Sequence, residues 1–211
     1  MLRIDCEQNT PEWYAARLGI PTASSFEKIL SPTGKLSTQA PAYMRRLVAE
    51  MVTGEQCEFV QSSEWMDRGK ELEVKAADEY EGFYAIGHKV EPIGFCLTDD
   101  KIAGCSPDRL VGDDGLLEIK CPAPHTHIDY LETGFDNGYK PQVQGQLYVT
   151  GRKWCHWYSY HPKMKPVVIT VERDEEYIGK LDKALRDFHK AKMELYNKIV
   201  GSEPKNLLLA G

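Results

Sequence analysis

Apolar side chains recur every three or four residues in several stretches of the chain, the spacing of helices that bury one face. Thr10-Pro11-Glu12 supplies an N-cap and a first-turn proline for the earliest stretch. Gly19-Ile20-Pro21 then breaks this helix, and a second one is expected to start at Thr22. The helical stretches predicted in this way are 11–30, 40–53, 62–84, 137–149 after Pro141, and 174–199.

Short runs of β-branched, aromatic and other apolar residues separate the later helices and are typical of strands. Acidic and glycine-rich turns stand between the first of them, at Asp99-Asp100 and 112–115. The predicted strands are 92–97, 110–111, 116–120, 154–160 and 167–171. The order is therefore helix, β-meander, helix, strand, strand, helix, which predicts a layered α/β fold with one central sheet.

One carboxylate interrupts the apolar face of the stretch 62–84. Glu73 falls in the middle of a stripe that includes Met66, Ala76 and Tyr80. A carboxylate in that position is costly unless it is paired or binds a metal. Alternatively, the helix is rotated slightly and Glu73 lies at a solvated edge.

Composition limits the classes of function. The 211 residues include 26 Lys and Arg against 32 Asp and Glu, a formal net charge of −6. This balance excludes a protein that coats nucleic acid by bulk positive charge, but it permits a local basic groove. Apolar residues make up 42% of the chain, which predicts one globular domain over 1–211.

Targeting and redox signals are weak. No stretch approaches the ~18 apolar residues of a membrane span, and the N-terminus turns acidic at Asp5 without the apolar core of a signal peptide. We therefore expect a cytoplasmic protein that does not enter membranes. The six cysteines form no CxxC pair and no zinc-finger spacing, so we expect most of them to be small buried hydrophobes.

Three charged residues stand at a spacing that suits metal chemistry. Asp108 lies ten residues before Glu118, across a tight predicted hairpin. Side chains alternate along a strand, so Glu118 and Lys120 share a face on which Asp108 lies beside Glu118. Adjacent carboxylates repel unless a cation lies between them, and oxygen ligands suit Mg²⁺ or Mn²⁺. The backbone carbonyl of Ile119 is a further possible ligand.

Lys120 adds a positive charge to this face. It is placed to orient an attacking water or to neutralise a phosphate oxygen, which together with a metal suits phosphodiester hydrolysis. The alternative is an ordinary salt-bridge trio on a hairpin. Pro107 before the aspartate, Glu73 upstream, and Gln142 and Gln144 on a downstream helix favour the functional interpretation.

Ser106-Pro107-Asp108 followed by Glu118-Ile119-Lys120-Cys121-Pro122 resembles the PD-(D/E)XK nucleases, and more narrowly the lambda-exonuclease or YqaJ-type viral recombinase group. Further blocks resemble that group in the same order, from Trp13 to Tyr177. These blocks are W-x-x-x-R-x-G-x-x-T-A-S at 13–24, G-x-x-x-E at 69–73, Q-x-Q at 142–144, and the segments 160–164 and 172–177.

The resemblance implies a restriction-endonuclease-like α/β core, in which helices flank a central mixed sheet. An N-terminal helical end-binding region (about 10–60) and a C-terminal helix (about 174–200) belong to the same domain. Asp108, Glu118 and the carbonyl of Ile119 would bind Mg²⁺, with two ions expected and Mn²⁺ as a substitute. The catalytic residues implied are Lys120, Glu73 and Gln142.

The resemblance also implies the reaction. The expected activity is 5′→3′ digestion of one strand of linear double-stranded DNA, which leaves 3′ tails for recombination. Arg17 and Ser24 would bind the 5′-phosphate of the digested strand. Arginine suits bidentate phosphate binding, and a first-turn serine lies where a helix N-terminus attracts anions. The alternatives are a surface charge for Arg17 and an N-cap for Ser24.

The family implies partners as well. We expect a ring-shaped homotrimer around the DNA, a single-strand annealing protein as partner, and a phage or prophage origin within a bacterial host. A compact body of this length has a radius of gyration of ~17 Å, too small to enclose a duplex alone. The alternative functions are a structure- or site-specific endonuclease on the same fold, and a non-catalytic DNA-binding assembly protein.

Other candidates are expected to be structural. His125 and His127 are predicted to lie in a loop without a metal role, and His161 occupies a variable position of its block. Trp65 or Met66, ahead of Glu73, is a candidate wedge between DNA strands. Core packing is expected, ahead of base stacking, for three aromatic residues, which are Trp154, Trp157 and Tyr158.

Overall fold

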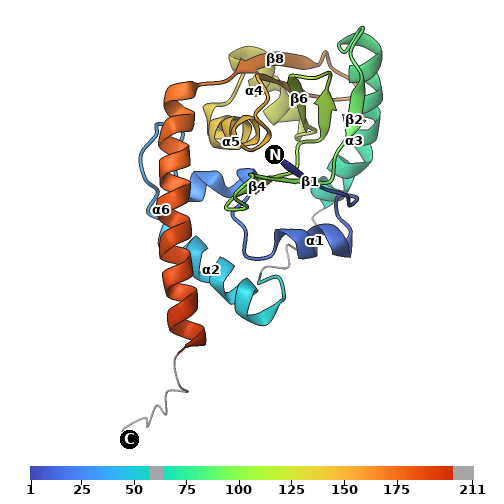
Figure 1. Ribbon diagram of the computed structural model, residues 1–211. Coiled ribbons are helices and arrows are strands. Elements are labelled where there is room, and N and C mark those ends of the chain that lie inside the picture. The colour runs from blue at the N-terminus through green and yellow to red at the C-terminus, as the bar shows by residue number, and fades with distance from the viewer. Residues whose placement is uncertain (58–63, 202–211) are drawn as a thin grey trace, which may run out of the picture.

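The computed structural model describes residues 1–57 and 64–201, apart from the side chains of 64–67 and 70. Groups of helices and groups of short strands follow one another in these parts, with 3₁₀ helices labelled η (Figure 1). The helices are α1 (Pro11–Arg17), η1 (Ala23–Lys28), α2 (Ala40–Thr53), α3 (Glu64–Phe83), α4 (Pro124–Thr133), η2 (Asn137–Tyr139), α5 (Lys140–Thr150) and α6 (Glu175–Val200). The strands are β1 (Leu2–Ile4), β2 (Val90–Pro92), β3 (Phe95–Leu97), β4 (Gly104–Cys105), β5 (Arg109–Val111), β6 (Gly115–Lys120), β7 (Trp154–Ser159) and β8 (Val167–Glu172).

The central sheet has five strands in the order β2-β5-β6-β7-β8. β6 and β7 run parallel, and the other neighbouring pairs are antiparallel. A parallel pair needs a crossover, which α4, η2 and α5 provide between these two strands. The predicted fold, a mixed sheet with helices around it, is confirmed.

Helices cover both faces of this sheet (Figure 1). β6 buries Leu117 and Ile119 against α3, and it buries Leu116 in the cluster that contains α5. Because side chains alternate along a strand, Glu118 and Lys120 point toward the α5 side. The α5 face of β6 therefore carries Leu116 at one end and the charged pair Glu118 and Lys120 at the other.

The long helix α6 runs beside α2 and α5 (Figure 1). Its residues Leu181, Leu185 and Phe188 are buried in a cluster with Tyr43 and Leu47 of α2. The apolar stripe predicted for this helix therefore faces the core. The last turn extends beyond the core, where Ile199 is half exposed.

The sequence run 92–97 does not form one strand. It divides at Ile93 and Gly94 into β2, in the central sheet, and β3, in a separate three-stranded sheet of order β1-β3-β4. A Cβ on Gly94 would lie 1.9 Å from the carbonyl oxygen of Cys6, so the N-terminal segment crosses directly over this glycine. This second sheet was not expected from the sequence.

Two helical predictions also need correction. The second half of the stretch 11–30 is the six-residue 3₁₀ helix η1 rather than an α-helix. His125 and His127 were expected in a loop but lie in α4. The wedge suggested for Trp65 or Met66 falls on side chains outside the description. None of the described helices has the length and hydropathy needed to cross a bilayer.

Candidate active site

Asp108 and Glu118 lie across from each other at the open end of the β5–β6 hairpin. Arg109 pairs with Leu117, and the N–H of Asp108 donates to the carbonyl of Leu117 at 3.1 Å. The Asp108 carboxylate accepts the N–H of Ile119 through Oδ2 at 2.5 Å. The hairpin therefore brings the two carboxylates together as its spacing predicts.

Glu118 is buried, with 4% of its surface exposed, and protein donors surround it. Oε1 accepts Lys120 Nζ and Gln142 Nε2, both at 2.6 Å, and Oε2 accepts Gln146 Nε2 at 2.6 Å. Gln142 also accepts from Lys120 Nζ through Oε1, at 3.3 Å. A buried charge is tolerated only when it is paired and hydrogen-bonded in this way.

Gln146 was not singled out from the sequence, although it contacts the buried carboxylate as closely as Gln142 does. It lies one helical turn after Gln142 on α5, so the i, i+4 spacing was the available signal. Gln144 faces away from Glu118. Its amide accepts the N–H of Asp174 and donates to the carbonyl of Glu172, which fixes the start of α6.

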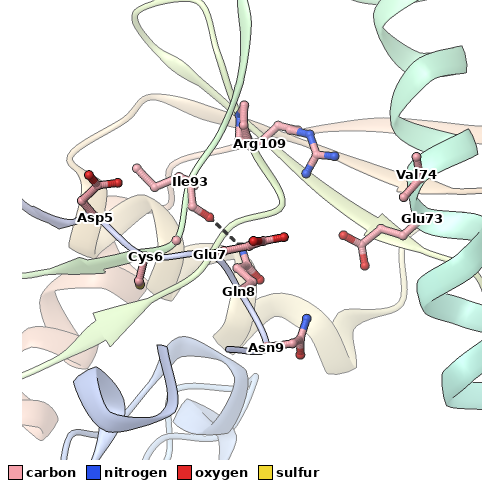
Figure 2. A pocket seen from close by; sticks show the side chains of 11 residues that line it. Asp5, Cys6, Glu7, Gln8, Asn9, Glu73, Val74, Ile93 and Arg109 are labelled. Atoms are coloured by element: carbon pink, nitrogen blue, oxygen red, sulfur yellow. Dashed lines mark hydrogen bonds between the residues drawn. The ribbon is translucent and has the colours of Figure 1, made fainter. Parts of the chain in front are cut away.

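Glu73 of α3 points into a cavity of about 550 Å³ beside this cluster. Arg109 of β5 lines the same cavity, and Glu7 and Gln8 of the N-terminal segment form another of its walls (Figure 2). Gln8 donates to the carbonyls of Ile93 and Pro107 and so joins this wall to the segment before Asp108. The solvated-edge interpretation of Glu73 is therefore incomplete, because its carboxylate lines a cavity.

The charges of the cluster influence one another strongly. Burial raises the pKa of Asp108 well above its usual range, and the nearby carboxylates of Glu118 and Glu73 raise it further. Burial alone would lower the pKa of Lys120, but the adjacent Glu118 outweighs it and the net pKa is raised. Lys120 is therefore a stable cation, and Asp108 holds its negative charge only at a cost.

The donor set suits a hard divalent cation. Lys120 uses its carbonyl to accept from Tyr160 on the β7 side. Successive backbone groups of a strand face opposite edges, so the N–H and carbonyl of Ile119 both face Asp108. A carbonyl and a carboxylate under repulsion are oxygen donors that a cation stabilises. Among the described residues, no three Asp, Glu, His or Cys side chains converge into a complete metal-binding cluster. The carboxylate of Glu118 accepts hydrogen bonds from Gln142 and Gln146.

Arg17 and Ser24 lie on either side of Thr22. Arg17 donates to Thr22 Oγ1 at 3.4 Å, and Thr22 Oγ1 lies 3.3 Å from Ser24 Oγ. Arg17 also stacks over Trp13, with 4.0 Å from the guanidinium carbon to the ring centroid. The structure therefore brings the two predicted phosphate ligands together.

The Arg17 block is joined to the carboxylate cluster at Ser106. This hydroxyl accepts the indole N–H of Trp13 at 2.8 Å and a guanidinium N–H of Arg17 at 3.5 Å. Ser106 is followed by Pro107 and Asp108. The N-terminal block and the metal motif, some 90 residues apart, therefore share a contact.

Three of the weaker candidates, which are His127, Trp157 and Tyr158, are packed in the interior. His127 is fully buried and bonds Ser159 Oγ at 2.8 Å and the carbonyl of Lys165 at 2.9 Å, whereas His125 is exposed. Trp157 and Tyr158 are fully buried, as core packing requires. Helical geometry separates the two histidines, so their i, i+2 spacing carries no shared site.

This mixed sheet with an acidic hairpin is the restriction-endonuclease-like fold. The profile of the YqaJ-like viral recombinase domain matches residues 12–153. The chain therefore belongs to the YqaJ-like viral recombinase family, as its motifs predict. No curated protein matches the chain.

Solved structures agree with this assignment. An alkaline exonuclease, LHK-Exo, from Laribacter hongkongensis is 32% identical over 91% of this chain and 97% of its own, with a TM-score of 0.81. LHK-Exo in complex with dAMP is 34% identical over 91% and 98%, with a TM-score of 0.78. A phage-related exonuclease from Haemophilus somnus 129PT shares 16% identity over 85% and 96%, with a TM-score of 0.67, and supports the fold alone. Family and relatives together support a nuclease function.

Proposed function

We propose that the protein is a Mg²⁺-dependent 5′→3′ exonuclease that digests one strand of linear double-stranded DNA and leaves 3′ single-stranded tails for recombination by strand annealing. The contact at Ser106 is the observation that carries this proposal. It places the Arg17 block next to the segment that leads into Asp108. An exonuclease needs this arrangement, because the end that it binds must lie close to the bond that it breaks.

Asp108, Glu118 and the carbonyl of Ile119 would hold the divalent cation, and Glu73 would hold a second ion or its water. When bound, such a cation polarises the scissile phosphate and lowers the pKa of a bound water. Mn²⁺ offers the same preference for oxygen ligands and would substitute. Glu118 would bind through an oxygen that its protein donors release.

Lys120 acts in this proposal as a fixed cation. Its raised pKa keeps it protonated, so it donates hydrogen bonds to the attacking water or a phosphate oxygen and does not take up a proton. Gln142 contacts both Lys120 and Glu118 and carries a donor and an acceptor on one amide. It would therefore fix the position of the Lys120 side chain and orient the attacking water.

Arg17 and Ser24 would bind the 5′-phosphate of the digested strand, with the Thr22 hydroxyl between them. The guanidinium and the hydroxyls carry this role. The six-residue 3₁₀ helix at Ser24 is too short to add much of a helix dipole, contrary to the reasoning from sequence. The exonuclease LHK-Exo binds dAMP, a nucleoside monophosphate, and this fits a pocket for one nucleotide at the strand end.

The proposed assembly is a homotrimeric ring around the DNA, with a single-strand annealing protein as partner, in the cytoplasm of a bacterial host of a phage or prophage. Enclosure of the duplex would explain continuous digestion, and one chain is too small to provide it. The proposed domain spans the whole chain.

Digestion of linear and closed circular duplex DNA with Mg²⁺ tests this function. The linear DNA should be degraded and the circle left intact, whereas an endonuclease would cut both. Lys120→Ala should abolish digestion, and Lys153→Ala, at an exposed lysine near the other end of β6, should not. Equal activity of wild type and Lys120→Ala, or inactivity of both, would reject the mechanism.

A further inference from the structure

The backbone N–H and carbonyl of Gly19 are both hydrogen-bonded to buried charged side chains. Its N–H donates to Glu50 Oε2 of α2 at 3.1 Å, and its carbonyl accepts from Lys192 Nζ of α6. Glu50 is 6% exposed and Lys192 is 4% exposed. Two helices far apart in the chain therefore converge on the two peptide groups that flank Gly19.

This arrangement is expensive for the fold. Burial lowers the pKa of Lys192 to about 8, and the charge of Glu50 opposes the shift only in part. Apolar residues of similar volume at such positions are often as stabilising as buried charged groups. The ion pair that Glu50 makes, with Arg46 Nε at 3.4 Å, is partly exposed and contributes little. Stability alone therefore does not account for Glu50 and Lys192.

The backbone at Gly19 has little room to change its conformation. Gly19 has φ +69°, and a Cβ at this position would lie 2.3 Å from Cγ of Met51. Ile20 donates to the carbonyl of Arg17 at 3.1 Å, which closes a tight turn around the glycine. The position of the Gly19 backbone therefore sets the direction of the chain after Arg17.

The turn around Gly19 carries the proposed phosphate ligands on both sides. Arg17 precedes it by two residues and donates to Thr22, which follows it by three. The N–H of Thr22 donates to the hydroxyl of Tyr43, on the same helix α2 that carries Glu50. If the backbone at Gly19 moved, the guanidinium of Arg17 would separate from the hydroxyls of Thr22 and Ser24.

We propose that Glu50 and Lys192 are positioning residues that clamp Gly19 and thereby give the enzyme its preference for 5′-phosphate monoesters at DNA ends. This inference rests on the proposed function, because it assumes that Arg17 and Ser24 bind the 5′-phosphate. It adds the C-terminal helix to the determinants of end recognition, with Lys192 acting through the carbonyl of Gly19.

The test compares kcat and KM on linear duplexes with 5′-phosphate and 5′-hydroxyl ends. Lys192→Met removes the donor and keeps the length of the side chain. It should raise KM for phosphorylated ends about tenfold, the scale of one hydrogen bond to a charged group, and leave kcat within about twofold. Glu50→Gln keeps an acceptor for Gly19 and should retain most of the preference. Lys183→Met, at an exposed lysine of the same helix, is the matched control and should behave as wild type.

Hydrogen exchange of residues 17–22 gives a second readout that does not depend on catalysis. It should accelerate in Lys192→Met and remain slow in the control. If Lys192→Met does not fold, the double variant Glu50→Leu with Lys192→Met removes both buried charged groups together, at the loss of the ion pair between Arg46 and Glu50, and should show the same rise in KM.

Two failures are distinguishable. A wild type that digests DNA without preferring 5′-phosphate ends would overturn the assignment of Arg17 and Ser24, and the clamp with it. A wild type with the preference, which Lys192→Met or the folded double variant retains, would overturn the clamp alone.

Discussion

Replacing Asp108 by asparagine should stabilise the metal-free protein and abolish its activity. The Asp108 carboxylate accepts the N–H of Ile119, and an asparagine carbonyl would keep that bond. The substitution removes a charge whose pKa is raised by burial, Glu118 and Glu73. The repulsion that these groups impose on the folded state therefore disappears, together with the metal ligand that the proposed mechanism assigns to Asp108.

The size of the effect follows from the cross-strand geometry. Side chains paired across a sheet lie about 5 Å apart. Two like charges at that distance repel by about 3 kcal/mol at an effective dielectric constant of about 20. Asp108 already escapes part of this cost by protonation, so a net gain of about 1–2 kcal/mol remains. For a chain of this size the melting temperature should rise by about 2–8 °C.

Thermal unfolding followed by circular dichroism, with and without Mg²⁺, measures this effect. Asp108→Asn should melt higher than wild type in EDTA. Mg²⁺ should raise the melting temperature of wild type and leave that of the variant nearly unchanged, because ligands stabilise only the state that binds them. Asp113→Asn, in the exposed turn of the same hairpin, is the control and should change little. A lower melting temperature for Asp108→Asn, with an unchanged response to Mg²⁺, would refute the reasoning.

Three further predictions concern the same cluster and the strand end. Gln146→Leu removes the donor to the buried Oε2 of Glu118 and should lower the free energy of unfolding by about 1–3 kcal/mol in urea titrations. The nuclease rate should fall at least tenfold. Unaltered stability and rate would contradict this role of Gln146. Asp108 is protonated more readily in the folded than in the unfolded chain, so metal-free wild type should lose stability as pH rises from about 3.9 through the raised pKa. Asp108→Asn should show a shallower pH slope in denaturant titrations, and equal slopes would argue against the shift. Arg17→Lys would remove the bidentate phosphate contacts proposed for Arg17 and should raise KM for 5′-phosphate ends without lowering kcat, which steady-state kinetics would check.

Periodicity located most of the helices because each buries one apolar face. α2 occupies the predicted range 40–53, and α6 begins one residue after the expected start, with Asp174 as its N-cap. The short strands were harder, because a run such as 92–97 carries no signal for the sheet that each half joins. The division at Gly94 depends on close contact with Cys6, almost 90 residues away.

In the candidate site, too, local contacts were predictable from the sequence and contacts between distant elements were not. The pairing of Asp108 with Glu118 was predictable, because a tight hairpin leaves only one register in which they meet. The contact of Gln146 with Glu118 required the packing of α5 on the sheet. The helix α4 was missed because it buries His127 and Tyr130 and leaves Ile128 and Leu131 half exposed. The clamp on Gly19 combines α2 and α6, and no local pattern indicates such a contact.

Release of label from a linear duplex tests the central claim most directly. One strand would carry a label on its 5′-terminal nucleotide in one sample and on its 3′-terminal nucleotide in the other, with Mg²⁺ and equal enzyme. The proposed 5′→3′ exonuclease should release the 5′ label first, as a mononucleotide, and the 3′ label only late. Earlier release of the 3′ label would contradict the polarity, and simultaneous release of both labels on long fragments would contradict exonuclease action altogether.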